Sequence, residues 1–281
     1  MKLFENVSLV SNIAKGYALP QALRIVSECG FDHVEIASIG GMCEHVSPRE
    51  ITPDYAAALA ERLKQANLKA FAFSGHVDLT REDEADDFLK KMELAAAIGC
   101  KVINTNAGPA AGLDSFRRHL RKVIDRAEKL ELTVCLESHG DIIGTAKNAA
   151  ALFRKINHPL IRMNYDTGNT YYYSKGAAAV EDDVLYALEY LAYVHIKDIH
   201  IDGDRAYYRP LGMGDINLYG FFDALKQLGR PISCGVEIPI FVHGTLERLS
   251  SSDAPIGEDA IRAAADQSIK YYKKLLHRLC N

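Results

Sequence analysis

The sequence predicts an α/β protein built as a single closed (β/α)₈ barrel, and three observations favour this fold. The length of 281 residues suits such a barrel, which typically takes about 250 residues. Short apolar runs alternate along the chain with longer segments of helical periodicity, as expected for strands and helices that follow one another. The apolar runs are nearly continuous, which is typical of parallel strands buried on both faces. No shift in composition divides the chain, so we expect residues 1–281 to form one domain.

Eight candidate strands can be identified, and each except the last is followed by a helical segment before the next strand begins. They span residues 4–9, 33–37, 69–73, 101–105, 133–137, 162–165, 193–197 and 233–238. An open doubly wound sheet is the alternative arrangement. The sequence disfavours it because the first strand–helix turn, near residues 11–17, carries no glycine-rich phosphate-binding motif.

The clearest helical periodicity occurs after the second, fourth and eighth strands. Segments 55–64, 116–124 and 260–279 carry apolar residues at steps of three and four, which places those residues on one side of a helix. Glycines stand where helices are expected to give way to strands, the usual position of a left-handed residue. These glycines are Gly30, Gly99 and Gly229.

Three connections are longer than a barrel requires. They span residues 38–53, 199–217 and 239–257, and each follows the carboxyl end of a strand. That face of a (β/α)₈ barrel carries the active site. Long loops there usually form walls or lids, so we expect these segments to enclose a pocket.

Charge and composition narrow the functional classes. The chain has 33 Lys and Arg against 37 Asp and Glu, a net charge of −4, which disfavours nucleic acid as a partner. No apolar stretch reaches the roughly 18 residues of a membrane span. The N-terminus has no secretory apolar run, and the six cysteines form no C-x-x-C pair. We therefore expect a cytoplasmic protein with reduced thiols.

The last four predicted strands end in polar residues. Glu137, Asp166, His195 and Glu237 stand at the ends of consecutive strands, so they would meet at the barrel mouth if each faces inward. Three adjacent carboxylates are costly unless a cation compensates them. Three carboxylates and one imidazole favour Mn²⁺ or Mg²⁺, and Co²⁺ or Zn²⁺ are compatible with the histidine. The remaining negative charge would be balanced by Lys197.

Each of these residues also has a purely structural interpretation. A single glutamate at a strand end is more often a salt-bridge partner than a ligand, and His195 alone could be a hydrogen-bonded core imidazole. Four such residues on four successive strands are much harder to explain in this way. The set therefore favours a metal site.

Several short motifs, in this order and spacing, resemble the xylose isomerase-like TIM-barrel superfamily of sugar isomerases and epimerases. They are LESH at 136–139, YDTGN at 165–169, VHIKD at 194–198, PLGMGDIN at 210–217 and GVEI at 235–238. The chain looks most like the D-tagatose 3-epimerase and inositol-catabolism isomerase branches. The resemblance implies one divalent metal held by Glu137, Asp166, His195 and Glu237.

The endonuclease IV branch of this superfamily is disfavoured. Its three metals need additional histidines, whereas this chain has Asn169 at one such position and ends its fourth strand in Asn104-Thr-Asn106. His76 remains in place. A DNA-repair enzyme is therefore the weaker alternative, and we expect no nucleic-acid partner.

The one-metal branch performs proton chemistry on sugars. A metal bound to a carbonyl and a neighbouring hydroxyl acidifies the C–H between them by stabilising an enediolate. A carboxylate removes the proton and a second group returns it. The resemblance implies that Glu137 and Glu237 are this acid/base pair. A metal-dependent dehydratase of a keto-polyol or dehydroshikimate-like substrate, and a non-catalytic sugar-binding barrel, remain alternatives. A homo-oligomer is implied only by resemblance.

Further side chains are candidate contacts to a sugar or polyol. They are His139, Lys197, His76, Asn169, Glu35 and Asn106. Glu35 ends the second strand, so it faces either the substrate or a salt-bridge partner. His139 would orient Glu137, bind a hydroxyl or lie in a surface loop. Of the three consecutive tyrosines at 171–173, we expect one to face the pocket.

Overall fold

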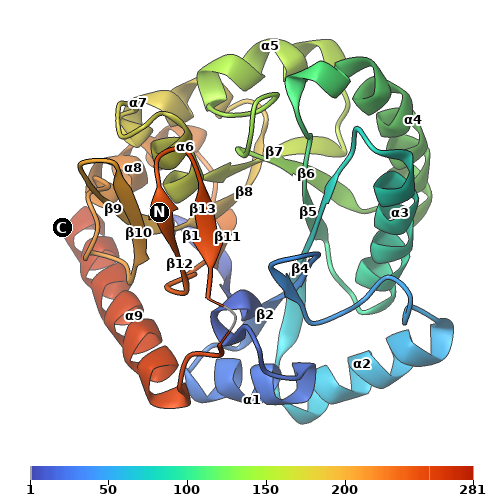
Figure 1. Ribbon diagram of the computed structural model, residues 1–281, viewed down its shortest axis with the longest axis horizontal. Helices are drawn as coiled ribbons and strands as arrows, with labels where there is room; N and C mark the ends of the chain where they lie inside the picture. Colours follow the sequence, from blue (N-terminus) through green and yellow to red (C-terminus); the bar gives the residue numbers. More distant parts are fainter. Residues whose placement is uncertain (1, 253, 281) are drawn as a thin grey trace.

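The computed structural model describes residues 2–252 and 254–280. Within these residues eight parallel strands form a closed barrel (Figure 1). They are β1 (Phe4–Val10), β2 (His33–Ile39), β4 (Lys69–Asp78), β5 (Val102–Asn106), β6 (Thr133–Glu137), β7 (Ile161–Asp166), β8 (Leu191–Ile196) and β11 (Ile232–Val236). The barrel closes because β1 pairs with both β2 and β11. The predicted fold and the location of its eight strands are thereby confirmed.

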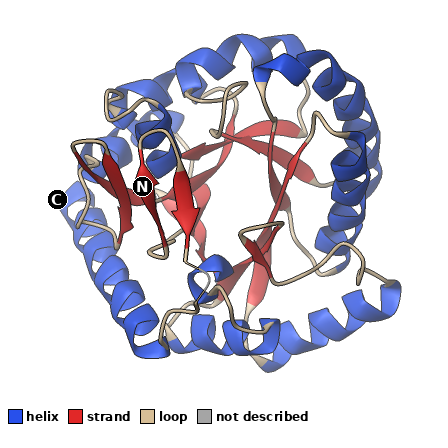
Figure 2. Cartoon of the chain, viewed as in Figure 1, coloured by secondary structure: helices blue, strands red, loops and turns tan. Residues whose placement is uncertain are grey.

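A ring of helices surrounds the barrel (Figure 2). The α-helices are α1 (Leu19–Glu28), α2 (Pro53–Gln65), α3 (Glu82–Ala97), α4 (Leu113–Leu130), α5 (Ala146–Ile156), α6 (Thr167–Tyr173), α7 (Val180–Asp183), α8 (Leu218–Leu225) and α9 (Glu258–Cys280). Short 3₁₀ turns are η1 (Ser11–Ala14), η2 (Ala110–Gly112), η3 (Val184–Ala187) and η4 (Lys226–Leu228). The local sequence explains where α2 begins, because the Thr52 side chain caps the helix by accepting a hydrogen bond from the Tyr55 amide.

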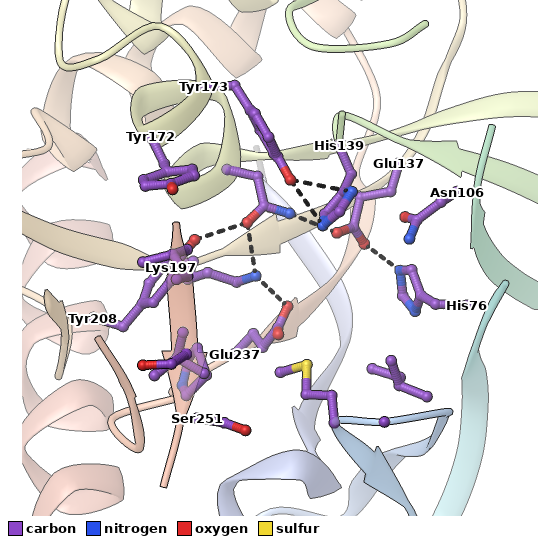
Figure 3. A pocket seen from close by; sticks show the side chains of 18 of the residues that line it. His76, Asn106, Glu137, His139, Tyr172, Tyr173, Lys197, Tyr208, Glu237 and Ser251 are labelled. Atoms are coloured by element: carbon purple, nitrogen blue, oxygen red, sulfur yellow. Dashed lines mark hydrogen bonds and ion pairs between the residues drawn. The ribbon is translucent and has the colours of Figure 1, made fainter. Parts of the chain in front are cut away.

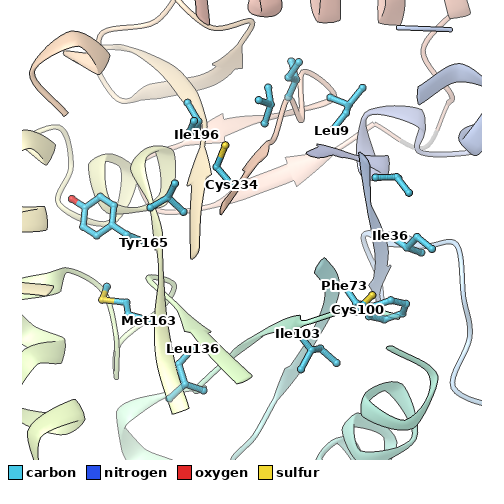
Figure 4. Close-up of a cluster of buried hydrophobic side chains, with 14 of the residues drawn as sticks. Leu9, Ile36, Phe73, Cys100, Ile103, Leu136, Met163, Tyr165, Ile196 and Cys234 are labelled. Atoms are coloured by element: carbon cyan, nitrogen blue, oxygen red, sulfur yellow. The ribbon is translucent and has the colours of Figure 1, made fainter. Parts of the chain in front are cut away.

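The main core lies between the outer faces of the strands and the helices. Figure 4 shows part of it, including Ile36, Phe73, Ile103 and Leu136, all fully buried. Alternate residues of each strand face the opposite side. There a small cluster of Ala72, Val102, Cys135 and Tyr193 packs inside the barrel.

The three long connections contain short strands that we predicted only as loops. In the described part of the chain, β9 (Asp198–Asp202), β10 (Arg205–Arg209), β12 (Val242–Thr245) and β13 (Leu249–Ser251) form an antiparallel sheet of four strands. The first connection contributes β3 (Cys43–Glu44), which pairs with β2. The Tyr172 hydroxyl on α6 donates to the Thr245 carbonyl at 3.0 Å, which ties this sheet to the barrel. None of the described helices is long and apolar enough to span a membrane.

Candidate metal centre

The ends of β6, β7, β8 and β11 bring four charged side chains together. The register pairs Asp166 with His195 and His195 with Gly235, so these strand ends lie at one level. His195 Nδ1 lies 2.9 Å from Glu137 Oε2, 3.1 Å from Glu237 Oε2 and 3.5 Å from Asp166 Oδ2. All four residues are buried.

The donor set fits a divalent cation. Glu137, Asp166 and His195 each offer one ligand atom, and these atoms lie within 4.8 Å of one another. Asp166 Oδ2 is buried and accepts no hydrogen bond of normal geometry from the described residues; its described contacts are ion pairs with Lys197 Nζ and His195 Nδ1. Glu237 adds a third carboxylate beside the same imidazole nitrogen. Oxygen ligands with one imidazole suit the cations predicted from the sequence.

Asp166 has a second role, at the start of α6. It is the N-cap of that helix, and its Oδ1 accepts a hydrogen bond from the Asn169 amide at 2.8 Å. Oδ1 is therefore hydrogen-bonded to the backbone of α6, while Oδ2 faces the candidate metal centre. Burial raises the pKa of Asp166, although Lys197 opposes this shift.

Lys197 supplies positive charge within the cluster. Its Nζ lies 2.8 Å from Asp166 Oδ2 and 2.9 Å from Glu237 Oε2. Burial alone would lower the pKa of this ammonium, but the carboxylates raise it well above its usual value. The ammonium thus occupies the charge-balancing position proposed from the sequence.

Glu137 is held by neighbours on both carboxylate oxygens. Its Oε2 lies 2.9 Å from His76 Nε2 and accepts from Asn164 Nδ2 at 2.9 Å. Its Oε1 accepts from Asn169 Nδ2 at 2.8 Å. Burial raises the pKa of Glu137, but the charges of His76 and His195 outweigh burial and hold it well below its usual range. Glu137 is therefore ionised at neutral pH.

Glu237 is also ionised. Its Oε1 accepts a hydrogen bond from Asn12 Nδ2 at 2.8 Å. Burial raises its pKa, yet Lys197 and His195 outweigh burial and lower the pKa to about 2. Asn12 lies in η1, directly after β1, and sequence reasoning missed it because no motif surrounds it.

A pocket of about 510 Å³ opens above the cluster (Figure 3). Among its described lining residues, only Glu137 and Glu237 come from the predicted ligand set; Asp166 and His195 lie deeper. Five of the six predicted substrate contacts also line it: His76, Asn106, His139, Asn169 and Lys197. Residues from all three long connections complete the wall, including Met42, Tyr208 and Val242.

The tyrosines differ from expectation. Both Tyr172 and Tyr173 line the pocket, whereas we expected only one of the three. Tyr208, from β10, was not predicted; its hydroxyl donates to Asn169 Oδ1 at 2.9 Å. Lys197 Nζ donates to the same oxygen at 3.3 Å. Asn169 therefore links Tyr208 on β10 to Glu137 by hydrogen bonds.

His139 lies in the wall beside Tyr173, whose hydroxyl is 3.1 Å from His139 Nε2. Burial lowers the pKa of His139 from 6.5 to about 4. Between these pH values the unfolded chain binds a proton that the folded protein does not. His139 should therefore lower the free energy of unfolding as the pH falls from about 6.5 to about 4, by at most about 3 kcal/mol.

We expect His139→Gln to remove that part of the acid destabilisation. Urea unfolding of wild type and variant across this pH range measures it. Parallel pH profiles for the two proteins would contradict the assignment.

Glu35 does not line the pocket, in contrast to the expected substrate contact. Its side chain is fully buried beneath His195, and His195 Nε2 lies 3.0 Å from Glu35 Oε1 and 3.1 Å from Oε2. The Ser74 hydroxyl, Asn104 Nδ2 and the Tyr193 hydroxyl also donate to this carboxylate, at 2.6, 2.7 and 2.9 Å. The alternative expectation, a salt bridge to a neighbouring strand, describes this geometry only in part. The imidazole lies against the carboxylate, but it comes from β8, which does not pair with β2.

Gly235 leaves room for this contact. A Cβ at position 235 would lie 2.5 Å from Glu35 Oε2 and 2.9 Å from His195 Cδ2. We expect Gly235→Ala to destabilise the protein by about 1–3 kcal/mol through overpacking. Chemical denaturation measures this loss, with Gly257→Ala as control, since a Cβ there meets no atom within 4 Å. Equal stabilities of the two variants would contradict the prediction.

The fold and the cluster define a (β/α)₈ barrel with a candidate metal centre at the carboxyl ends of its strands. The model of the xylose isomerase-like TIM barrel family matches residues 23–275. The chain belongs to this family, which confirms the resemblance seen in the sequence motifs.

Solved structures share the fold at low identity. A xylose isomerase domain protein from Planctomyces limnophilus has a TM-score of 0.76 and 15% identity, with 99% of each chain covered. A xylose isomerase-like TIM barrel protein from Mycobacterium smegmatis in complex with magnesium has a TM-score of 0.75 and 17% identity, with 98% of each chain covered. A D-allulose 3-epimerase from Methylomonas sp. in complex with D-allulose has a TM-score of 0.71 and 18% identity, covering 97% of this chain and 99% of that one. No curated protein matches the sequence.

Proposed function

We propose that this protein is a divalent-metal-dependent isomerase or epimerase of a sugar or related keto-polyol. One observation carries the proposal: two ionised glutamates, Glu137 and Glu237, flank His195 Nδ1 and are the members of the predicted ligand set that reach the pocket. Solved relatives support it, since one is described in complex with magnesium and another with D-allulose.

The cation would be held by Glu137, Asp166, His195 and Glu237. When bound, it would polarise a substrate carbonyl and so acidify the neighbouring C–H. Mn²⁺ or Mg²⁺ suits this oxygen-rich set best.

The two glutamates would move the proton. Their low pKa values keep both ionised, which is the form that a base requires. One glutamate removes the proton from the substrate carbon, and the other must take a proton from solvent before it returns one to that carbon. This order predicts that hydrogen from solvent enters the product.

The pocket wall would hold the substrate. His76, Asn106 and His139 offer polar groups toward it, and Tyr172 and Tyr173 supply aromatic surface. Its volume of about 510 Å³ lies within the range of small-molecule sites.

The test is a screen of the metal-loaded protein against ketohexoses, ketopentoses, inososes and keto-glycosides in deuterated water, read by NMR. The expected result is an epimer or isomer with deuterium at the reacting carbon. A product lighter by one water would identify a dehydratase instead. No turnover of any substrate, together with no metal bound by the purified protein, would contradict the proposal.

A further inference from the structure

A carboxylate buried beneath the pocket has no direct access to a substrate. Glu35 is 0% exposed, and it does not line the pocket above His195. A buried carboxylate is costly unless it is fully hydrogen-bonded. Glu35 meets this condition with four partners, of which only the His195 imidazole belongs to the candidate metal centre.

The contact determines which way the imidazole faces. An ionised carboxylate can only accept hydrogen bonds, so Glu35 requires a proton on His195 Nε2. Nδ1 then faces Glu137, Asp166 and Glu237, all within 3.5 Å. Without a cation, Nδ1 also carries a proton toward these carboxylates. A bound cation would take the place of that proton, whereas the proton on Nε2 would stay with Glu35. A histidine that donates one ring N–H to a carboxylate is held in a single tautomer and becomes a stronger metal ligand through the other nitrogen.

The surroundings hold Glu35 rigidly. Ser74 on β4, Asn104 on β5 and Tyr193 on β8 each donate to it, so three strands fix its carboxylate. Gly235 on β11 permits the close approach, because any larger residue would collide with Glu35 and His195. These contacts orient Glu35 independently of any bound cation.

We infer that Glu35 is a positioning residue that directs His195 Nδ1 toward the cation and thereby raises the preference of the site for nitrogen-binding cations. This inference rests on the proposed function, because it requires that the cluster binds a divalent metal. It assigns Glu35 a role in metal selectivity, in place of the substrate contact expected from the sequence.

The experiment compares Co²⁺ and Mg²⁺ affinities of wild type and Glu35→Gln by titration calorimetry. The amide can either accept from or donate to Nε2, so it no longer imposes one tautomer. Co²⁺ affinity is expected to fall by about 10–100-fold. Mg²⁺ prefers oxygen ligands and depends less on imidazole, so its affinity should fall several-fold less.

Two further variants make the test independent of folding. Glu35→Asp keeps the charge but moves it away from Nε2, and is expected to weaken Co²⁺ binding in the same selective way. Asp183→Asn is the matched control: Asp183 is also buried and accepts from the Tyr165 hydroxyl at 3.1 Å and from the Ala146 amide at 2.8 Å. It should lose stability while the ratio of Co²⁺ to Mg²⁺ affinity remains that of wild type.

Equal losses of Co²⁺ and Mg²⁺ affinity in Glu35→Gln would overturn the inference, because a remote negative charge would act on both cations alike. Unchanged affinities would overturn it as well. Both of these results leave the proposed function intact. If the wild-type protein binds neither cation, the proposed function fails and this inference fails with it.

Discussion

The substitutions Glu137→Gln and Glu237→Gln are each expected to lower the exchange of a substrate C–H proton with deuterated water by about 10²–10⁴-fold. Glutamine nearly preserves the shape of each side chain but cannot accept the proton. Both residues line the pocket and are ionised at neutral pH, so each is in the form that the proposed base requires. NMR in deuterated water, with a substrate found by the screen, measures the rate.

Metal affinity has to be measured in the same variants, because both glutamates are also candidate ligands. Saturating metal then separates loss of the base from loss of the cation. Glu247→Gln is the control: Glu247 lines the same pocket but pairs with the exposed Lys175 at 2.5 Å. It should retain wild-type exchange. Retained exchange in Glu137→Gln or Glu237→Gln would remove that glutamate as the base.

Lys197→Met is expected to lower the free energy of unfolding of the metal-free protein by about 3–5 kcal/mol, because it leaves buried carboxylates without their partner. Asp166 and Glu237 both lose the ammonium that lies within 3 Å of them. A divalent cation would neutralise the same carboxylates. Added Mg²⁺ should therefore raise the free energy of unfolding more in this variant than in wild type. Urea denaturation with and without Mg²⁺ measures both effects.

Lys91→Met provides the matched control. Lys91 is also buried, but its ammonium donates to backbone carbonyls, those of Ser38 at 2.6 Å and of Gly75 and His76 at 3.5 Å. Unlike Lys197, it does not pair with Asp166 or Glu237. Its loss should destabilise the protein without changing the stabilisation by Mg²⁺. If Mg²⁺ stabilises both variants equally, Lys197 does not compensate the metal-site carboxylates.

The barrel could be predicted because its signals are local. Buried parallel strands are continuous apolar runs, and polar residues at the ends of consecutive strands must meet at one face. This reasoning placed Glu137, Asp166, His195 and Glu237 in one cluster without any knowledge of tertiary contacts. The position two residues after His195 also indicated the charge partner, Lys197.

Other parts of the site depend on geometry that is not local. Glu35 lies within the second strand, yet whether it points into the pocket or beneath His195 depends on contacts with three other strands. Asn12 and Tyr208 lie in connections between barrel strands. No regular spacing of apolar residues there indicates where these side chains point. The number of tyrosines in the wall depends on where α6 begins, and this was not predicted. Counting charges from the sequence also omitted Glu35, the carboxylate that contacts His195 from beneath the metal centre.

The helix cap at Asp166 couples two properties of the pocket. Because one oxygen of this side chain starts α6 and the other faces His195, α6 carries Tyr172 and Tyr173 into the wall at a position set by the candidate ligand itself. Changing residue 166 would alter both the charge that holds a cation and the aromatic surface that meets a substrate. New substrate preferences should therefore evolve more readily by substitutions in the long connections than by substitutions that change the start of this helix, because only the latter also affect the metal centre.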